Sequence, residues 1–245
     1  MSRVLFRVGR ITVYSYTAMQ YVGIVLGIFA QKYVAIASGL NPTRVLTATF
    51  LLLIPALAGA RLFYLLLHWR SYRRDPRRIL RQSEGGAAVY GGLMLGVPIS
   101  IPVLALLRLP FGAYWDTAAF TILIGVMLGR IGCVMNGCCC GRPNSGCFAL
   151  QLPDRNGEWK RRIPTQILEA AWCLVLLTGA FFLRRKLPFP GAIMLFALFG
   201  YGTGRFFLEA TREYQDRIGE FSVQRLVSIA LVVASLGILA ILGPR

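Results

Sequence analysis

The stretch from residue 129 to residue 141 reads GRIGCVMNGCCCG and carries the clearest chemical signal in this chain. It closes a very apolar run and opens a basic loop, so Arg130 falls where a membrane helix should end. A guanidinium group can form paired hydrogen bonds with a phosphate, and the neighbouring glycines allow a close approach of the backbone. The stretch therefore predicts a site for an anionic lipid headgroup.

A second charged motif lies in a later apolar run. Tyr201, Arg205 and Glu209 are spaced four residues apart, so they share one face of a helix. Charged side chains within membrane helices are costly and usually face the bundle interior or a cavity. Arg205 could bind a phosphate while Glu209 holds its guanidinium group in place. The alternative is an Arg–Glu pair that only satisfies itself. Arg61 is another arginine inside an apolar run.

A tyrosine between two glycine pairs marks the start of another apolar run. The sequence GGAAVYGG covers residues 85–92 and places Tyr90 directly before Gly91 and Gly92. Glycines at a helix start allow close approach of a lipid headgroup or of another helix. The sequence leaves both alternatives open.

The composition places these motifs in a membrane protein. Hydrophobic residues make up 56% of the 245 residues, in runs that end at Arg, Lys, Gly or Pro. Backbone in lipid must satisfy its own hydrogen bonds, and the runs lack the alternation of barrel strands. We therefore predict an all-α polytopic membrane protein, a single domain over residues 1–245. The turn-rich segment 130–165 is expected to form a small extramembrane head. Seven transmembrane spans are expected, near residues 13–31, 45–68, 89–107, 115–129, 166–183, 190–208 and 221–242.

The net charge of +17 comes from 27 Lys and Arg against 10 Asp and Glu. These basic residues lie in short loops between apolar runs, which favours anionic membrane lipid rather than nucleic acid as the partner. A simple count places 17 of the 27 on the side of the N-terminus and 7 on the other side. The positive-inside rule would then put the N-terminus in the cytoplasm, if the arginines set topology rather than bind lipid. No cleavable signal peptide is expected.

Five of the six cysteines fall in one loop region, and Cys173 lies in a later apolar run. Their spacing lacks paired C-x-x-C ligands and has no histidine nearby, so no metal site is predicted. The only histidine, His68, is interpreted as a membrane-interface residue. Disulfides in an outer-face loop and a nucleophilic thiolate beside Arg130 stay open as alternatives. The five clustered cysteines are Cys133, Cys138, Cys139, Cys140 and Cys147.

Taken together, these motifs resemble the prolipoprotein diacylglyceryl transferase family over nearly the whole chain. The segment 164–169, PTQILE, resembles a further family motif, as do the 85–92 stretch and the Tyr201 to Glu209 face. Gln224 and, less closely, Tyr16 also fall at positions that resemble the family. In the first stretch the match is carried by Gly129, Arg130, Gly132, Asn136 and Gly141.

The resemblance implies a reaction and a location. The reaction is transfer of a diacylglyceryl group from phosphatidylglycerol to the lipobox cysteine thiol of a preprolipoprotein, which releases glycerol 1-phosphate and uses no cofactor. The location is the bacterial plasma membrane, with the N-terminus outside and the C-terminus in the cytoplasm, against the simple charge count. The implied catalytic residues are Arg130, Arg205, Tyr90 and Glu209. The implied substrate-binding residues are Tyr16, Arg61, Gly91, Gly92, Gly132, Asn136, Gly141, Gln166 and Tyr201.

The chain departs from the family pattern at positions that would carry chemistry. Tyr90 and Ile163 stand where the family has histidines, and Cys133 and Cys138 replace the signature asparagine and glutamate. A neutral tyrosine is a poor general base at pH 7, so the base is not identified. The alternatives are a diverged phospholipid-binding homologue and a transferase for another acceptor. A transporter or channel is disfavoured because no internal repeat is found.

Overall fold

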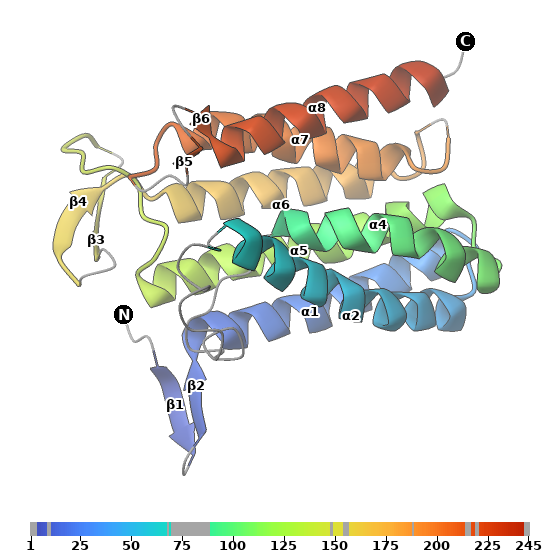
Figure 1. The fold of residues 1–245 in the computed structure, drawn as a ribbon, viewed down its shortest axis with the longest axis horizontal. Coiled ribbons are helices and arrows are strands. Elements are labelled where there is room, and N and C mark those ends of the chain that lie inside the picture. The colour runs from blue at the N-terminus through green and yellow to red at the C-terminus, as the bar shows by residue number, and fades with distance from the viewer. Residues whose placement is uncertain are drawn as a thin grey trace. The chain divides into compact units, whose positions relative to one another are not determined.

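The computed structural model describes residues 4–8, 11–67, 69, 89–147, 149–153, 157–187, 189–213, 217–218 and 221–242. Seven helices lie in these ranges, and each corresponds to one predicted span, so the all-α class is confirmed (Figure 1). His68, Gly85 and Gly86 lie outside the described residues. The helices are α1 (Ser15–Ala37), α2 (Pro42–Leu67), α4 (Val89–Leu106), α5 (Phe111–Asn136), α6 (Thr165–Leu183), α7 (Ala192–Glu209) and α8 (Val223–Leu242).

Five of the described helices, α1, α2, α5, α6 and α8, are long and apolar enough to cross a membrane. The apolar part of α4, Gly91–Leu106, is shorter. In α7 the charges of Arg205 and Glu209 interrupt an otherwise apolar sequence. The protein is therefore a multi-pass α-helical membrane protein, as its composition predicts.

Helix α5 differs most from its predicted span, because it runs on to Asn136 instead of ending at residue 129. The glycines and Arg130 suggested a loop. In the structure Arg130 has an ion-pair partner, and Gly132 packs against α1. A Cβ atom at Gly132 would lie 3.2 Å from Tyr16 Cα, so glycine lets the two helices approach closely. The motif is thus mostly helical.

Within the described ranges, three short antiparallel hairpins accompany the helices (Figure 1). The hairpin of β1 (Val4–Val8) and β2 (Ile11–Tyr14) precedes α1. Strands β3 (Leu150–Pro153) and β4 (Trp159–Arg162) form a hairpin between α5 and α6, within the segment predicted as a small head. Strands β5 (Arg217–Ile218) and β6 (Phe221–Ser222) lie between α7 and α8.

The chain divides into two compact units. The smaller one, Ala35–Tyr114, contains α2 and α4. These helices meet at Gly59 and Gly91, where a Cβ atom on either glycine would collide with the carbonyl oxygen of the other. Gly92 faces Ala56 in the same way, with its Cβ position 3.0 Å from the carbonyl oxygen. Gly91 and Gly92, which were predicted to bind the lipid headgroup, thus lie in a helix–helix contact. Their binding of the headgroup stays a prediction.

The larger unit, Met1–Val34 with Trp115–Arg245, holds α6 to α8 and most of α1 and α5. Polar side chains join its helices where lipid cannot satisfy them. Thr121 of α5 donates to the Gly27 carbonyl of α1 at 2.9 Å and to Gln31 Oε1 at 3.0 Å. Trp172 Nε1 of α6 donates to the Gly200 carbonyl of α7 at 2.9 Å. These bonds fix neighbouring helices against one another.

The N-terminus of α7 is capped from another helix. Asp116, in the second turn of α5, accepts the backbone N–H groups of Gly191 at 2.7 Å and Met194 at 3.0 Å. A helix N-terminus leaves such groups without partners inside the helix, and its dipole favours a carboxylate there. Asp116 therefore anchors one end of α7, and the other end carries the charged groups described next.

Candidate active site

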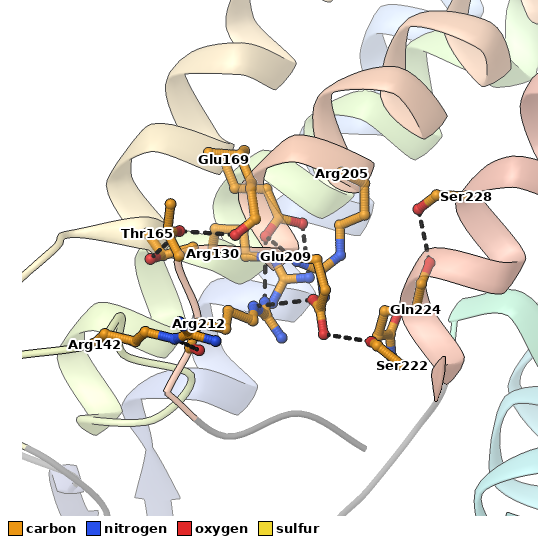
Figure 2. A network of polar contacts seen from close by, with 12 residues as sticks. Arg130, Arg142, Thr165, Glu169, Arg205, Glu209, Arg212, Ser222, Gln224 and Ser228 are labelled. Carbon is orange, nitrogen blue, oxygen red and sulfur yellow. Dashed lines mark hydrogen bonds and ion pairs between the residues drawn. The ribbon is translucent and has the colours of Figure 1, made fainter. Parts of the chain in front are cut away.

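Glu169 in the first turns of α6 is the centre of a buried charge cluster (Figure 2). Its side chain is only 1% exposed. Its Oε1 lies 2.8 Å from Arg130 Nη2, and its Oε2 lies 3.5 Å from Arg205 Nη1 and 3.3 Å from Arg212 Nη2. The Tyr201 hydroxyl donates to Oε1 at 2.9 Å. One carboxylate thus holds three guanidinium groups from different parts of the chain.

The predicted polar face of α7 is present and turns toward Glu169. Tyr201 and Arg205 both reach this carboxylate. Arg205 Nη2 also pairs with Glu209 Oε2 at 2.8 Å, which is the i,i+4 contact that the spacing predicts. Arg205 is 1% exposed and lies between the two buried carboxylates of Glu169 and Glu209.

Arg212 and Ser222 complete the cluster beyond the end of α7. Arg212 Nε lies 3.9 Å from Glu209 Oε2, and the Ser222 hydroxyl donates to Glu209 Oε1 at 2.9 Å. Three guanidinium groups therefore surround two carboxylates, which leaves one positive charge in excess. Arg130 is 18% exposed, so it is the most accessible arginine of the cluster. A buried excess of positive charge favours an anionic ligand.

Backbone pairing holds the surrounding loops together. The Gly141 N–H donates to the Ile163 carbonyl at 3.2 Å, and the Arg142 N–H donates to the Thr211 carbonyl at 2.8 Å. A Cβ atom at Gly141 would collide with the Ile163 carbonyl oxygen and the Thr165 hydroxyl. This predicted site residue thus permits a close packing of three segments. The hydroxyl oxygens of Thr165 and Thr211 lie 2.9 Å apart in the same region.

The turn after α5 brings three thiols together. The Gly137 N–H donates to the Val134 carbonyl at 3.2 Å, and the Cys138 N–H donates to the Cys133 carbonyl at 3.1 Å. Gly137 has a left-handed backbone, with φ of 68°. These features define a Schellman motif, which places the residue after the glycine against the last turn of the helix. The Sγ atoms of Cys133, Cys138 and Cys139 all lie within 4.8 Å of one another.

The environment of this turn shifts the pKa values of its cysteines. The pKa of Cys139 is lowered, first by hydrogen bonds with Cys133 and Cys138 and then by the charges of Arg212 and Arg130. Burial raises the pKa of Cys140, whose thiol lies 3.7 Å from Glu213 Oε2. All six cysteines of the chain are free thiols in this structure.

Several predicted substrate-binding residues surround the same turn. Gln166 Nε2 donates to the Cys138 carbonyl at 2.8 Å. Asn136 is the last residue of α5, and its side chain is hydrogen bonded with Cys138. Tyr16 lies in the first turn of α1, beside Gly132. Gln166 Oε1 is buried and has no hydrogen-bond partner among the described residues.

Other predicted site residues belong to the smaller unit. Arg61 of α2 lies over the ring of Tyr64, with 5.9 Å between its Cζ atom and the ring centroid. Gly91 and Gly92 pack against α2. For Tyr90 the structure describes the backbone alone, in the first turn of α4. The role of these four residues in a site stays a prediction.

Sequence reasoning missed Glu169, Arg212 and Ser222 as members of the cluster. Glu169 had a usable signal, because it is a carboxylate near the start of an apolar run and no nearby basic residue can pair with it. Arg212 follows Glu209 by three residues, which is helical pairing distance. Ser222 has no such signal, since its contact with Glu209 depends on the return of the chain to α8.

Comparisons with known proteins agree with this arrangement. A family model described as prolipoprotein diacylglyceryl transferase matches residues 3–241. Three similar proteins are all named phosphatidylglycerol–prolipoprotein diacylglyceryl transferase. The one from Halalkalibacterium halodurans is 31% identical over 96% of this chain and 84% of its own length. The one from Geobacillus kaustophilus is 30% identical over 97% and 91%, and the one from Trichormus variabilis is 27% identical over 99% and 90%.

Proposed function

Because this chain belongs to the prolipoprotein diacylglyceryl transferase family, we propose that it transfers a diacylglyceryl group from phosphatidylglycerol to a cysteine thiol of a preprolipoprotein. The relatives carry this activity in their names and match nearly the whole chain. The acceptor is the lipobox cysteine of the signal peptide. The chain acts in the bacterial plasma membrane, with its N-terminus outside.

The reaction makes two chemical demands on the protein. A sulfur–carbon bond forms, and the carbon–oxygen bond between the diacylglyceryl group and the phosphate breaks. Glycerol 1-phosphate leaves with the electron pair, so negative charge grows on the phosphate in the transition state and must be stabilised. The thiol must also lose its proton, because the thiolate is the nucleophile.

The observation that supports this function best is the buried cluster of three arginines around Glu169 and Glu209. We assign the phosphate to Arg130, which is the most exposed of the three arginines and lies near the end of the helix that carries the family motif. Its second guanidinium edge can bind a phosphate while the first is held by Glu169.

The more deeply buried groups then act through Arg130. Glu169 orients Arg130, and Tyr201 and Arg205 orient Glu169. Glu209 holds Arg205 in turn. We therefore assign Arg205 a positioning role, because it is 1% exposed and lies between two carboxylates. This differs from the direct phosphate contact that the sequence suggested for it.

The headgroup of phosphatidylglycerol also carries hydroxyl groups. Gln166 offers a buried carbonyl oxygen that accepts no hydrogen bond within the described chain. A hydroxyl group of the headgroup can donate to this oxygen, which would favour glycerol over choline. Gln166 thus provides a candidate for headgroup selection beside the phosphate site.

The second candidate function is phospholipid binding without transfer. It is favoured by the ion pairs that satisfy one another in the cluster, and by tyrosine and isoleucine at the family histidine positions. A transfer assay separates the two functions. Purified protein is mixed with phosphatidylglycerol vesicles and a lipobox peptide, and lipidated peptide and glycerol 1-phosphate are measured. Formation of both products supports the transferase, whereas vesicle binding without product supports the alternative.

A further inference from the structure

Three thiols lie together at the turn that ends α5. The sulfurs of Cys133, Cys138 and Cys139 form one group within 4.8 Å, and no fourth His, Cys, Asp or Glu joins them within the described part of the chain. Cys133 is buried, while Cys138 and Cys139 are partly exposed. Cys139 has a φ of 60°, a backbone conformation that is strained for a residue with a side chain. Such strain is often kept at functional sites.

This arrangement of three free thiols fits a zinc ion. Three protein ligands plus one open position are typical of catalytic zinc sites, whereas structural sites have four protein ligands. Zinc–sulfur bonds of about 2.3 Å hold the sulfurs of a tetrahedral site about 3.8 Å apart, so shifts of about 1 Å would close this one. The Cys140 thiol is directed to Glu213 instead, at 3.7 Å, and does not take the fourth position.

The surrounding charges suit such a site. A zinc ion with three thiolates carries one net negative charge. The guanidinium groups of Arg130 and Arg212 act electrostatically on Cys139, and they would offset this charge. Arg130 is also the residue assigned to the phosphate, so the zinc site and the phosphate site are adjacent along α5. The two reactants of the transfer would thus meet beside one turn of the helix.

We propose that Cys133, Cys138 and Cys139 bind zinc, and that the acceptor cysteine of the preprolipoprotein takes the open fourth position. This inference rests on the proposed function, since it concerns the acceptor of the same reaction. It revises the sequence-based expectation of no metal site, which considered spacing but not the Schellman turn. A zinc ion would also favour the thiolate form of the acceptor in a chain that has Tyr90 and Ile163 at the family histidine positions.

The step conserves atoms and charge. The acceptor sulfur binds zinc and its proton passes to water, because a metal-bound thiol is deprotonated. This sulfur then forms a bond with the carbon of the diacylglyceryl group that is joined to the phosphate oxygen. The carbon–oxygen bond breaks, and glycerol 1-phosphate leaves with the electron pair. Zinc keeps its oxidation state, and the uncharged thioether product is a weaker ligand than the thiolate, so it dissociates.

The test uses the full chain purified in detergent. Zinc per chain is measured by elemental mass spectrometry for the unchanged protein and for Cys133→Ser, Cys138→Ser and Cys139→Ser. The matched control is Cys147→Ser, which removes an exposed thiol of the same loop region. Cobalt(II) is then bound in place of zinc, and its visible spectrum is recorded with a lipobox peptide and with the same peptide carrying serine for cysteine. Transfer is measured before and after chelation.

We expect about one zinc ion per chain in the unchanged protein and in Cys147→Ser, and loss of zinc in the three other variants. The cysteine peptide should change the cobalt spectrum, and the serine peptide should not. Chelation should lower transfer at pH 7 by about 30-fold, because a free thiol with a pKa near 8.5 is only about 3% ionised, and zinc should restore the rate.

Three results would each overturn one element: the metal site, its role in activating the acceptor, or the proposed function. Full transfer by a protein that binds neither zinc nor cobalt would overturn the metal site. Zinc binding with a transfer rate that chelation leaves unchanged would overturn its role in activating the acceptor. Zinc binding and a peptide-dependent cobalt spectrum in a protein that transfers nothing would support the site and reject the proposed function.

Discussion

Glu169 of α6 and Arg130 of α5 form an ion pair of 2.8 Å between Oε1 and Nη2. The carboxylate is buried, and the arginine reaches the more accessible side of the cluster. Glu169 also meets Arg205 and Arg212, so one side chain sets the position of three positive charges. The strongest tests of the site start from this residue.

Replacement of Glu169 by glutamine should impair both folding and transfer. The neutral amide leaves three buried guanidinium groups without their shared carboxylate, and breaking a buried ion pair in this way costs about 3–5 kcal/mol. We expect a clear loss of thermal stability in detergent and a fall in transfer of about 100-fold in the folded fraction. Glu158→Gln is the matched control, because Glu158 and Lys160 form an exposed pair. Equal stability and activity of the two variants would reject the central role of Glu169.

Arg130→Ala should reduce transfer more than it reduces stability. The loss of one charge-assisted contact with the phosphate costs about 2–4 kcal/mol in the transition state, or roughly 30- to 1000-fold in rate. The protein should still reach the membrane, because Arg130 is partly exposed. Arg225→Ala serves as the control, since Arg225 is an exposed arginine beside the Phe206 ring. A rate for Arg130→Ala close to that of the control would contradict the phosphate assignment.

Arg205→Ala should reduce transfer and stability together. Arg205 pairs with two buried carboxylates, so its removal leaves Glu169 and Glu209 with uncompensated charge. Arg205→Lys should restore little, because an ammonium group cannot form the two-pronged contact. Thermal melting of both variants, read beside their transfer rates, checks this prediction. A normally stable Arg205→Ala protein with no activity would instead indicate direct contact with the phosphate.

Tyr90 should assist the reaction without being its obligatory base. A phenol with a reference pKa near 10 is almost fully protonated at pH 7. We expect Tyr90→Phe to lose about tenfold in rate, which is the effect of one hydrogen bond. Tyr90→His restores the residue type of the family and should keep or raise the activity. An inactive Phe variant at a normal membrane level would show that the phenol itself moves the proton.

The glycine contact between α2 and α4 tests whether Gly91 binds the headgroup or only packs. Gly91→Ala and Gly59→Ala introduce the same clash from opposite sides of one contact. If packing is the whole role, both variants should lose stability by similar amounts, on the order of 1–3 kcal/mol, and keep their activity per folded molecule. A selective rise in the KM for phosphatidylglycerol in Gly91→Ala would indicate a headgroup contact.

A reporter fused to the C-terminus should be active in the cytoplasm. This topology places the N-terminus and the 130–165 segment outside, against the simple count of positive charges. The reason is that arginines assigned to lipid binding, as we propose for Arg130, would not serve as topology signals. An external reporter would reverse the proposed orientation.

The sequence predicted the local relationships of this fold well. Apolar runs located all seven helices, because span length depends on bilayer thickness. The Arg205–Glu209 pair followed from helical spacing. The end of α5 was wrong, because glycines that normally break a helix are retained where another helix packs against them. The partnership of Arg130 with Glu169 depends on the packing of α5 beside α6, which no short-range pattern encodes.

The cluster of three thiols is a second feature that the sequence pattern did not predict. The sequence argued against a metal site because the cysteines lack C-x-x-C pairs and have no histidine nearby. A helix that ends in a Schellman turn brings these positions together, so the expected conformation decides what a spacing means. A helix that reaches Asn136 and a left-handed Gly137 would have indicated the cluster in advance.

The cap that Asp116 forms on α7 has a mechanical consequence. This helix is clamped at its first turn by Asp116 and at its last turns by Glu169 and Ser222. A shift of one residue along its axis, about 1.5 Å, would break contacts at both clamps at once. Such a helix cannot slide along its axis during the catalytic cycle. Any motion that admits the lipid and the peptide must therefore come from other segments, while α7 stays in place.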